Sequence, residues 1–100
     1  MEVSRNLEWS ERAILDYENL VEYLFFKWGE SITLKVLSEI DYQISRVAKY
    51  PEQFPIVNKP NEIRRCVASP QTSIFFVVKP QSIYLLSIFD NRLDPDKHPG

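Results

Sequence analysis

The last third of the chain, from Ile63 to Phe89, most constrains the fold, because it holds three apolar runs of strand length separated by turn signals. The runs read Ile-Arg-Arg-Cys-Val, Ser-Ile-Phe-Phe-Val-Val and Ile-Tyr-Leu-Leu-Ser-Ile-Phe, and a Lys-Pro-Gln-Ser turn separates the last two. Short apolar runs bounded by such turns are typical of consecutive strands. The pattern predicts a three-stranded antiparallel meander.

The first thirty residues predict a strand followed by a helix. Apolar and polar residues alternate over 3–9, which is typical of a half-buried strand. Ser10 is a suitable N-cap, and Gly29 is well placed to end the helix. Between them, residues at spacings of three and four form one apolar stripe: Ile14, Tyr17, Val21, Leu24 and Trp28.

A second amphipathic helix is predicted from near Ser31 to Pro51. Its stripe consists of Val36 or Leu37, then Ile40, Ile44 and Val47. The short connection at Gly29 makes the two helices an antiparallel hairpin. Residues 51–62 hold three prolines and are predicted to be an ordered loop that buries Phe54, Ile56 and Val57.

These elements predict one domain over residues 1–100, since a chain of this length buries a single core. The expected class is α+β with the order β-α-α-β-β-β, in which the helical hairpin covers one face of a four-stranded, mostly antiparallel sheet. The predicted core residues are Trp9, Leu24, Ile40, Ile44, Phe75, Val77 and Leu85.

Composition narrows the cellular setting. Cys66 is the only cysteine, the N-terminus is polar, and no apolar run approaches the length of a membrane span, so a cytoplasmic protein without membrane contact is expected. Cys66 and His98 are too few for a soft-metal site, and neither a metal nor another cofactor is expected.

Charge is unevenly distributed, although the net charge is only −2. Residues 1–58 carry six Lys/Arg and ten Asp/Glu, whereas residues 59–100 carry six and four. The predicted meander therefore has a small basic surplus, which is weaker than that of a general nucleic-acid binder. Chance alone produces such a split in many small proteins.

Arginines flank the meander. Arg64 and Arg65 are neighbours in its first strand, so their side chains point to opposite faces, and periodicity alone does not decide which one faces away from the helices. Arg92 follows the last strand. One hypothesis is a phosphate clamp made by Arg92 with Arg64 or Arg65. The alternative is that these arginines pair with nearby carboxylates, such as Asp90 for Arg92.

Several motifs in this order resemble the RelE/ParE superfamily of bacterial toxins from type II toxin–antitoxin, or plasmid stabilisation, modules. The resemblance covers about residues 3–95. It rests on a strand-to-helix junction with Trp9-Ser10, an aromatic–proline segment from Tyr50-Pro51 to Phe54-Pro55, the strand Ile63-Arg64-Arg65, and the closing run Phe89-Asp90-Asn91-Arg92-Leu93-Asp94-Pro95.

The resemblance implies a growth-inhibiting toxin neutralised by a cognate antitoxin, as a homodimer or as a heterotetramer with that antitoxin. In the ParE branch the toxin binds DNA gyrase. In the RelE branch it is an endoribonuclease that cuts mRNA on the ribosome. A domain that keeps the fold without toxicity is a third alternative, which the acidic pI near 5.4 favours slightly.

The candidate site residues follow from these alternatives. Arg65, Arg92 and His98 are the candidate catalytic residues, and Arg64 and Lys59 are candidates for target binding. RNA cleavage needs a base and an acid that titrate near neutral pH, and His98 is the only histidine. The non-catalytic, gyrase-binding hypothesis is preferred, because the meander itself contains no convincing general base.

Overall fold

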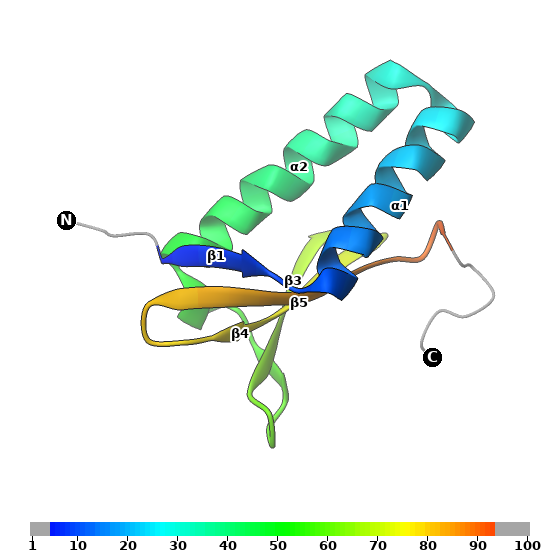
Figure 1. Cartoon of the computed structure of the whole chain (residues 1–100). Coiled ribbons are helices and arrows are strands. Elements are labelled where there is room, and N and C mark those ends of the chain that lie inside the picture. The colour runs from blue at the N-terminus through cyan, green and yellow to red at the C-terminus, as the bar shows by residue number, and fades with distance from the viewer. Residues whose placement is uncertain (1–4, 94–100) are drawn as a thin grey trace.

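The computed structural model describes residues 5–93 and has two layers (Figure 1). Its elements in chain order are β1 (Asn6–Trp9), α1 (Glu11–Trp28), α2 (Glu30–Lys49), a 3-10 turn (Pro51–Gln53), β2 (Ile56–Asn58), β3 (Ile63–Ser69), β4 (Thr72–Val78) and β5 (Ser82–Asp90). The helical hairpin covers one face of the sheet, and the other face is not covered by a helix. The predicted α+β class is confirmed, and the predicted elements follow one another in the predicted order, with one additional strand, β2.

The sheet has five strands in the order β1-β5-β4-β3-β2, so the prediction of four strands is wrong by one. β1 runs parallel to β5, and the other neighbours are antiparallel. The additional strand, β2, lies in the segment predicted to be a loop. It forms a hairpin with β3 that projects from the body of the sheet (Figure 1). Ile56 and Val57 are therefore exposed, contrary to prediction, and only Phe54 is buried.

The predicted ends of α1 are confirmed. The Ser10 hydroxyl accepts a hydrogen bond of 2.9 Å from the backbone N–H of Ala13. Gly29 has a φ of 87°, which favours glycine, and its N–H donates to the Phe25 carbonyl. This single residue joins the two helices, because α2 begins at Glu30.

The buried face of α1 differs from the predicted stripe. Leu24 is fully buried as predicted, but its companions are Ala13 and Leu20, whereas Ile14 and Trp28 are 44% and 54% exposed. A helix with apolar residues around much of its circumference allows more than one stripe at the same spacing, and packing against the sheet selects one. In α2 the predicted residues Ile40, Ile44 and Val47 are all buried.

The predicted core residues in β4 lie on the wrong face. Phe75 and Val77 are only partly buried, and the core contains Ile74 and Phe76. Because both faces of β4 are apolar, periodicity does not distinguish them. Trp9 is also partly buried, and its ring meets that of Tyr17 edge to face at 5.5 Å. Leu85 is fully buried, as predicted.

A β-bulge at Leu86 changes the face that β5 presents to the helices. Phe75 pairs with Ser87 but Phe76 pairs with Leu85, so Leu86 has no direct partner on β4. The Ser10 hydroxyl donates to the Leu86 carbonyl at 2.7 Å, and the Asp16 carboxylate accepts from the Ile88 N–H at 3.0 Å. The first turns of α1 therefore hold the bulge in place.

Within residues 5–93, neither helix is both long and apolar enough to cross a membrane. In the same part of the chain, no group of three or more His, Cys, Asp or Glu side chains is arranged to hold a metal ion.

The buried position of Leu24 predicts how much stability is lost when its side chain is shortened. Leu24→Ala should lower the free energy of unfolding by about 2–5 kcal/mol, because the side chain is fully buried between the helices and the sheet. Ile14→Ala, on the exposed side of the same helix, should cost less than about 1 kcal/mol. Urea denaturation of the two variants measures both values, and equal losses would contradict this packing.

Candidate functional site

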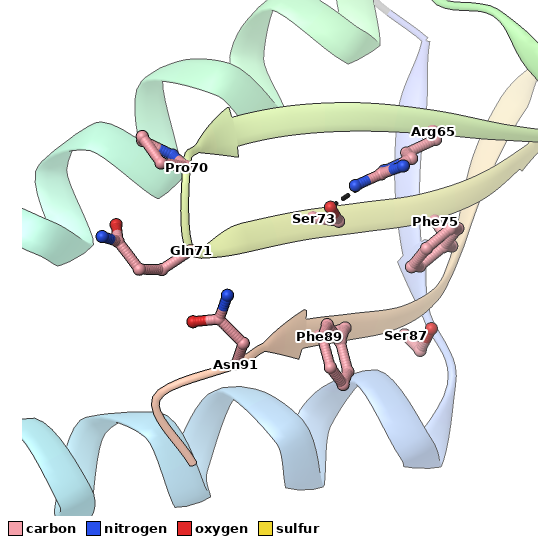
Figure 2. Close-up of a pocket in the computed structure, with 8 residues that line it drawn as sticks. All are labelled: Arg65, Pro70, Gln71, Ser73, Phe75, Ser87, Phe89 and Asn91. Atoms are coloured by element: carbon pink, nitrogen blue, oxygen red, sulfur yellow. Dashed lines mark hydrogen bonds between the residues drawn. The ribbon is translucent and has the colours of Figure 1, made fainter. Parts of the chain in front are cut away.

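The face of the sheet opposite the helices carries a hollow of about 510 Å³. Side chains from β3, β4, β5 and the adjacent turns line it, as Figure 2 shows. The lining residues are Arg65, Pro70, Gln71, Ser73, Phe75, Ser87, Phe89 and Asn91. We call this hollow the open-face site.

Arg65 is the charged residue of the open-face site. It pairs with Phe75 across the β3–β4 ladder, and its Nε–H donates to the Ser73 hydroxyl at 2.9 Å (Figure 2). Ser73 is only 6% exposed, so this bond fixes the inner part of the guanidinium against the sheet. Within residues 5–93 no carboxylate forms an ion pair with Arg65, and none lines the hollow.

Two phenylalanine side chains belong to the same lining as this guanidinium. Phe75 and Phe89 both line the hollow, and both remain partly exposed because no helix covers this face. Apolar neighbours lower the local dielectric constant, which strengthens the attraction between a cation and a bound anion. The hydroxyls of Ser73 and Ser87 and the amides of Gln71 and Asn91 add neutral hydrogen-bonding groups.

Arg64 lies on the opposite side of β3. It pairs with the buried Phe76, and its Nη1 donates to the Phe54 carbonyl at 2.6 Å. The question that the sequence leaves open is therefore answered by the register: Arg65 faces the open side, and Arg64 faces the helix side. Arg64 ties the segment after α2 to the sheet.

Arg92 is paired with Asp90 rather than placed in the open-face site. Its Nε–H donates to one carboxylate oxygen of Asp90 at 2.9 Å and an Nη2–H donates to the other at 2.7 Å, which is a bidentate geometry. The Asp90 side chain is fully buried, and it also accepts hydrogen bonds from the Thr72 hydroxyl and the Arg92 backbone N–H. The structure therefore shows the second alternative for Arg92, in which it forms an ion pair with a nearby carboxylate.

This network sets the pKa of Asp90. Burial opposes its ionisation, but hydrogen bonds from the Arg92 side chain, the Thr72 hydroxyl and the Arg92 backbone, together with the charge of Arg92, outweigh burial and lower the pKa of the carboxyl. The same contact raises the pKa of the Arg92 guanidinium. Asp90 and Arg92 therefore fix the end of β5 as an ion pair.

The remaining sequence candidates lie elsewhere. Lys59 is exposed in the turn of the projecting β2–β3 hairpin, away from the lining of the hollow. His98 lies outside the described residues. The hollow lined by Arg65 therefore does not include Lys59, Arg64 or Arg92. The functional roles of all these sequence candidates remain predictions.

Cys66 lies in the core, as its apolar neighbours in the sequence predict. Burial raises the pKa of its thiol to about 11, although the positive charge of Arg46 acts in the opposite direction. The thiol is therefore protonated near neutral pH and is not suited to nucleophilic chemistry.

The open-face site is equipped for anion recognition. Its lining supplies one guanidinium, aromatic surface and neutral hydrogen-bonding groups. None of its eight lining residues is a His, Cys, Asp, Glu, Lys or Tyr, so these residues do not include the usual side chains for general acid–base catalysis.

Sequence reasoning missed most of this lining. Phe75 was predicted to be in the core, and Ser73 and Ser87 were not singled out. One available signal was the charge of Arg65 directly before the apolar run Cys66-Val67-Ala68, because a charged side chain in a strand favours an uncovered face. The bulge that turns Ser87 and Phe89 to the open face leaves no comparable signal.

No protein-family model and no curated protein sequence matches this chain. Solved structures do match its fold. A chain of the chromosomal ParDE toxin–antitoxin system from P. aeruginosa is similar, with a TM-score of 0.74 and 21% identity over 87% of this chain and 96% of that one. The fold is that of the RelE/ParE-type toxins.

Two further structures extend this similarity. A metal-bound toxin from Helicobacter pylori has a TM-score of 0.58 and 17% identity, over 88% of this chain and 96% of its own. A chain of the E. coli DinJ-YafQ toxin–antitoxin complex has a TM-score of 0.55 and 11% identity, over 90% and 96%. The chain thus spans nearly the whole length of each neighbour.

The Asp90–Arg92 pair predicts an acid-sensitive contribution to stability. Because the folded pKa of Asp90 is lowered, its contribution is fully present above the ordinary carboxyl pKa of about 3.9 and is lost as the pH falls through the folded value. Asp90→Asn should cost on the order of 2–3 kcal/mol at neutral pH, and the difference from wild type should shrink below about pH 4.

Urea denaturation at several pH values tests this, with the exposed Asp41→Asn as a matched control that should change stability little. A penalty for Asp90→Asn that stays constant down to pH 2 would contradict the ion-pair interpretation.

Proposed function

We propose that this chain is the toxin of a type II toxin–antitoxin system, and that it inhibits growth by binding its target through the open-face site. The match in fold to chains of toxin–antitoxin systems over almost its full length supports the first part. The observation that carries the second part is Arg65, a guanidinium with no carboxylate partner in the described residues, which shares an uncovered sheet face with Phe75 and Phe89.

The proposed target is DNA gyrase, as in the ParE branch. The highest of the three TM-scores belongs to the chain from the ParDE system. The absence of proton-transfer groups among the lining residues also favours a site that binds over one that cleaves RNA. An acidic side chain or a phosphate at the gyrase–DNA interface would provide the anion for Arg65.

The proposed antitoxin binds the helical side of the molecule. Two adjoining hollows of about 260 and 500 Å³ run along α1 and share Tyr17 and Glu18. Trp9, Ile14 and Val21 supply apolar surface, while Glu18 and Glu22 supply negative charge. This combination fits an amphipathic segment with Lys or Arg on its polar face, which folds on binding.

A growth assay with charge-matched variants tests the toxin proposal. Arg65→Gln should abolish growth inhibition, because it removes the anion-binding group without disturbing the core. Lys35→Gln removes the same charge from an exposed position on α2 and should remain toxic. Wild-type protein should inhibit DNA supercoiling by purified gyrase, and Arg65→Gln should not.

Three results would contradict this proposal, and each has its own meaning. Codon-specific cutting of mRNA on ribosomes by the wild type would establish the endoribonuclease alternative. Full toxicity of Arg65→Gln would remove the open-face site from the mechanism. No growth inhibition by the wild type, with the fold intact, would indicate a domain without toxicity.

Antitoxin binding gives a separate prediction. The product of a small gene adjacent to this one should co-purify with the wild-type chain. The double variant Glu18→Lys with Glu22→Lys should raise the dissociation constant of that complex about tenfold or more, which is the effect expected for close charge pairs. Glu52→Lys with Glu62→Lys makes the same charge change at exposed positions away from α1 and should bind normally. Equal binding by both double variants would exclude this surface.

A further inference from the structure

The open-face site contains a single cation, and this limits which anions it can recognise. Within residues 5–93, Arg65 is the only positively charged residue that lines the hollow, and no carboxylate lies within ion-pair distance of it. Its Nε–H donates to the Ser73 hydroxyl, so its two Nη groups are left to meet a ligand. Two neighbouring Nη groups match the two oxygens of one carboxylate or of one phosphate.

A second cation on the same face is already neutralised. Lys79 follows β4, and its ammonium lies 3.8 Å from the Glu8 carboxylate and over the Tyr84 ring, at 4.6 Å from the ring centroid. Tyr84 points away from the helices, because its neighbours Ile83 and Leu85 are buried against them. Glu8 is the register partner of Tyr84 and shares its face. The Lys79–Glu8 pair therefore adds no net charge to the open face.

The arginines nearest to this face are also unavailable to a ligand there. The Arg92 guanidinium is bound in bidentate geometry by Asp90, and Arg12 Nε lies 3.0 Å from an Asp16 carboxylate oxygen. Arg64 points to the helix side of β3. Among the described residues that β1, β3, β4 and β5 direct to the open face, Arg65 is therefore the one charge without a counter-charge.

One unbalanced cation does not make a nucleic-acid surface. Proteins that bind nucleic acid neutralise several phosphates, and the release of counterions from each phosphate provides much of the affinity. A surface that neutralises one phosphate gains only a small part of this affinity, and the net charge of −2 opposes the approach of a polyanion. One guanidinium is, in contrast, sufficient to pair with one carboxylate.

The rest of the lining suits a peptide. Phe75 and Phe89 offer apolar surface on which a side chain next to the bound carboxylate can pack. The amides of Gln71 and Asn91 each contain donors and an acceptor, so they can pair with both the N–H and the C=O of a bound backbone. Figure 2 shows these amides near the ends of the strands, with Arg65 further along the sheet. The volume of about 510 Å³ is typical of a site for a drug-sized ligand, a size that a tripeptide matches.

We propose that the open-face site recognises a single carboxylate, on an Asp or Glu with an apolar neighbour in an extended segment of a protein, rather than the phosphates of a nucleic acid. This inference rests on the proposed function, since it names the chemical group of the target that the open-face site binds. For gyrase it means that Arg65 pairs with the protein and not with the DNA that gyrase holds.

An NMR titration of the isotope-labelled full-length chain with matched probes tests the chemical class without gyrase. Acetyl-Leu-Asp-Leu-amide should shift the signals of the Arg65 Nε–H and of the Phe75 and Phe89 rings in a saturable manner. Acetyl-Leu-Asn-Leu-amide has nearly the same shape without the charge and should bind about tenfold more weakly. A thymidine and a uridine dinucleotide, each with one phosphodiester, should also bind more weakly than the Asp tripeptide.

Two variants assign this preference to Arg65. Arg65→Gln should bind the Asp and Asn tripeptides with equal affinity, because the cation that distinguishes them is absent. Lys35→Gln removes the same charge from an exposed position on α2 and should keep the tenfold preference. The backbone NMR spectrum of each variant verifies its fold.

Three results of this titration would overturn the inference. They are equal binding of the two tripeptides by the wild type, tighter binding of either dinucleotide, and no saturable binding of the Asp tripeptide at the open-face site. None of them depends on gyrase or on growth inhibition, so they are distinguishable from a failure of the proposed function.

Binding to purified gyrase separates the two proposals further. The dissociation constant should be the same with and without DNA, and it should rise less than about fivefold between about 50 and 200 mM salt, whereas six or more phosphate contacts would raise it on the order of a thousandfold. Binding that requires DNA, or that has the steeper salt dependence, would overturn the carboxylate inference and leave the toxin proposal standing. Recognition of the Asp tripeptide without any binding of gyrase would support the carboxylate inference and contradict gyrase as the target.

Discussion

The β-bulge at Leu86 determines which side chains of β5 face the helices and which face outward, and both the open-face site and the Asp90–Arg92 pair depend on it. Before the bulge, Ile83 and Leu85 are buried against the helices; without it, strict alternation would place residues 87 and 89 there as well. The bulge reverses the alternation, so that Ile88 and Asp90 are buried and Ser87 and Phe89 line the open-face site. The hydrogen bonds from the start of α1 to β5 hold this arrangement, which couples the N-terminal junction to a surface on the other side of the sheet.

The two arginines that frame the meander have different surroundings and therefore different roles. Arg92 follows a buried carboxylate, and its guanidinium is satisfied by Asp90 in bidentate geometry, so little of its charge remains for a partner. Arg65 faces the uncovered side, where its only described side-chain contact is to the neutral Ser73 hydroxyl. A charge without a carboxylate partner on an uncovered sheet face contributes little to folding, and this makes Arg65 the stronger candidate for recognition.

The sequence alone predicts the elements whose pattern of apolar and capping residues is compatible with only one local structure. The caps at Ser10 and Gly29, the buried stripe of α2 and the meander follow from local chemistry that the fold does not override. It was insufficient where two faces are equally apolar, as in β4, where Phe76 rather than Phe75 enters the core. It also could not predict the bulge or the pairing of β2, because each depends on contacts with residues distant in the chain.

The exposed end of the helical hairpin has the same physical origin as the error in the predicted stripe of α1. Apolar residues on α1 are more numerous than one buried face can hold, so any single stripe leaves others exposed. Along the middle of α1 the surplus includes Ile14 beside Glu18, and at the helix end it includes Phe25, Phe26 and Trp28. A 100-residue chain can bury only a small core. Apolar side chains that remain exposed outside that core lower the solubility of the protein and do not add to its stability. Such a distribution is what binding partners that cover this apolar area would require, and the surface along α1 with Ile14 and Glu18 is one place where a partner can do so.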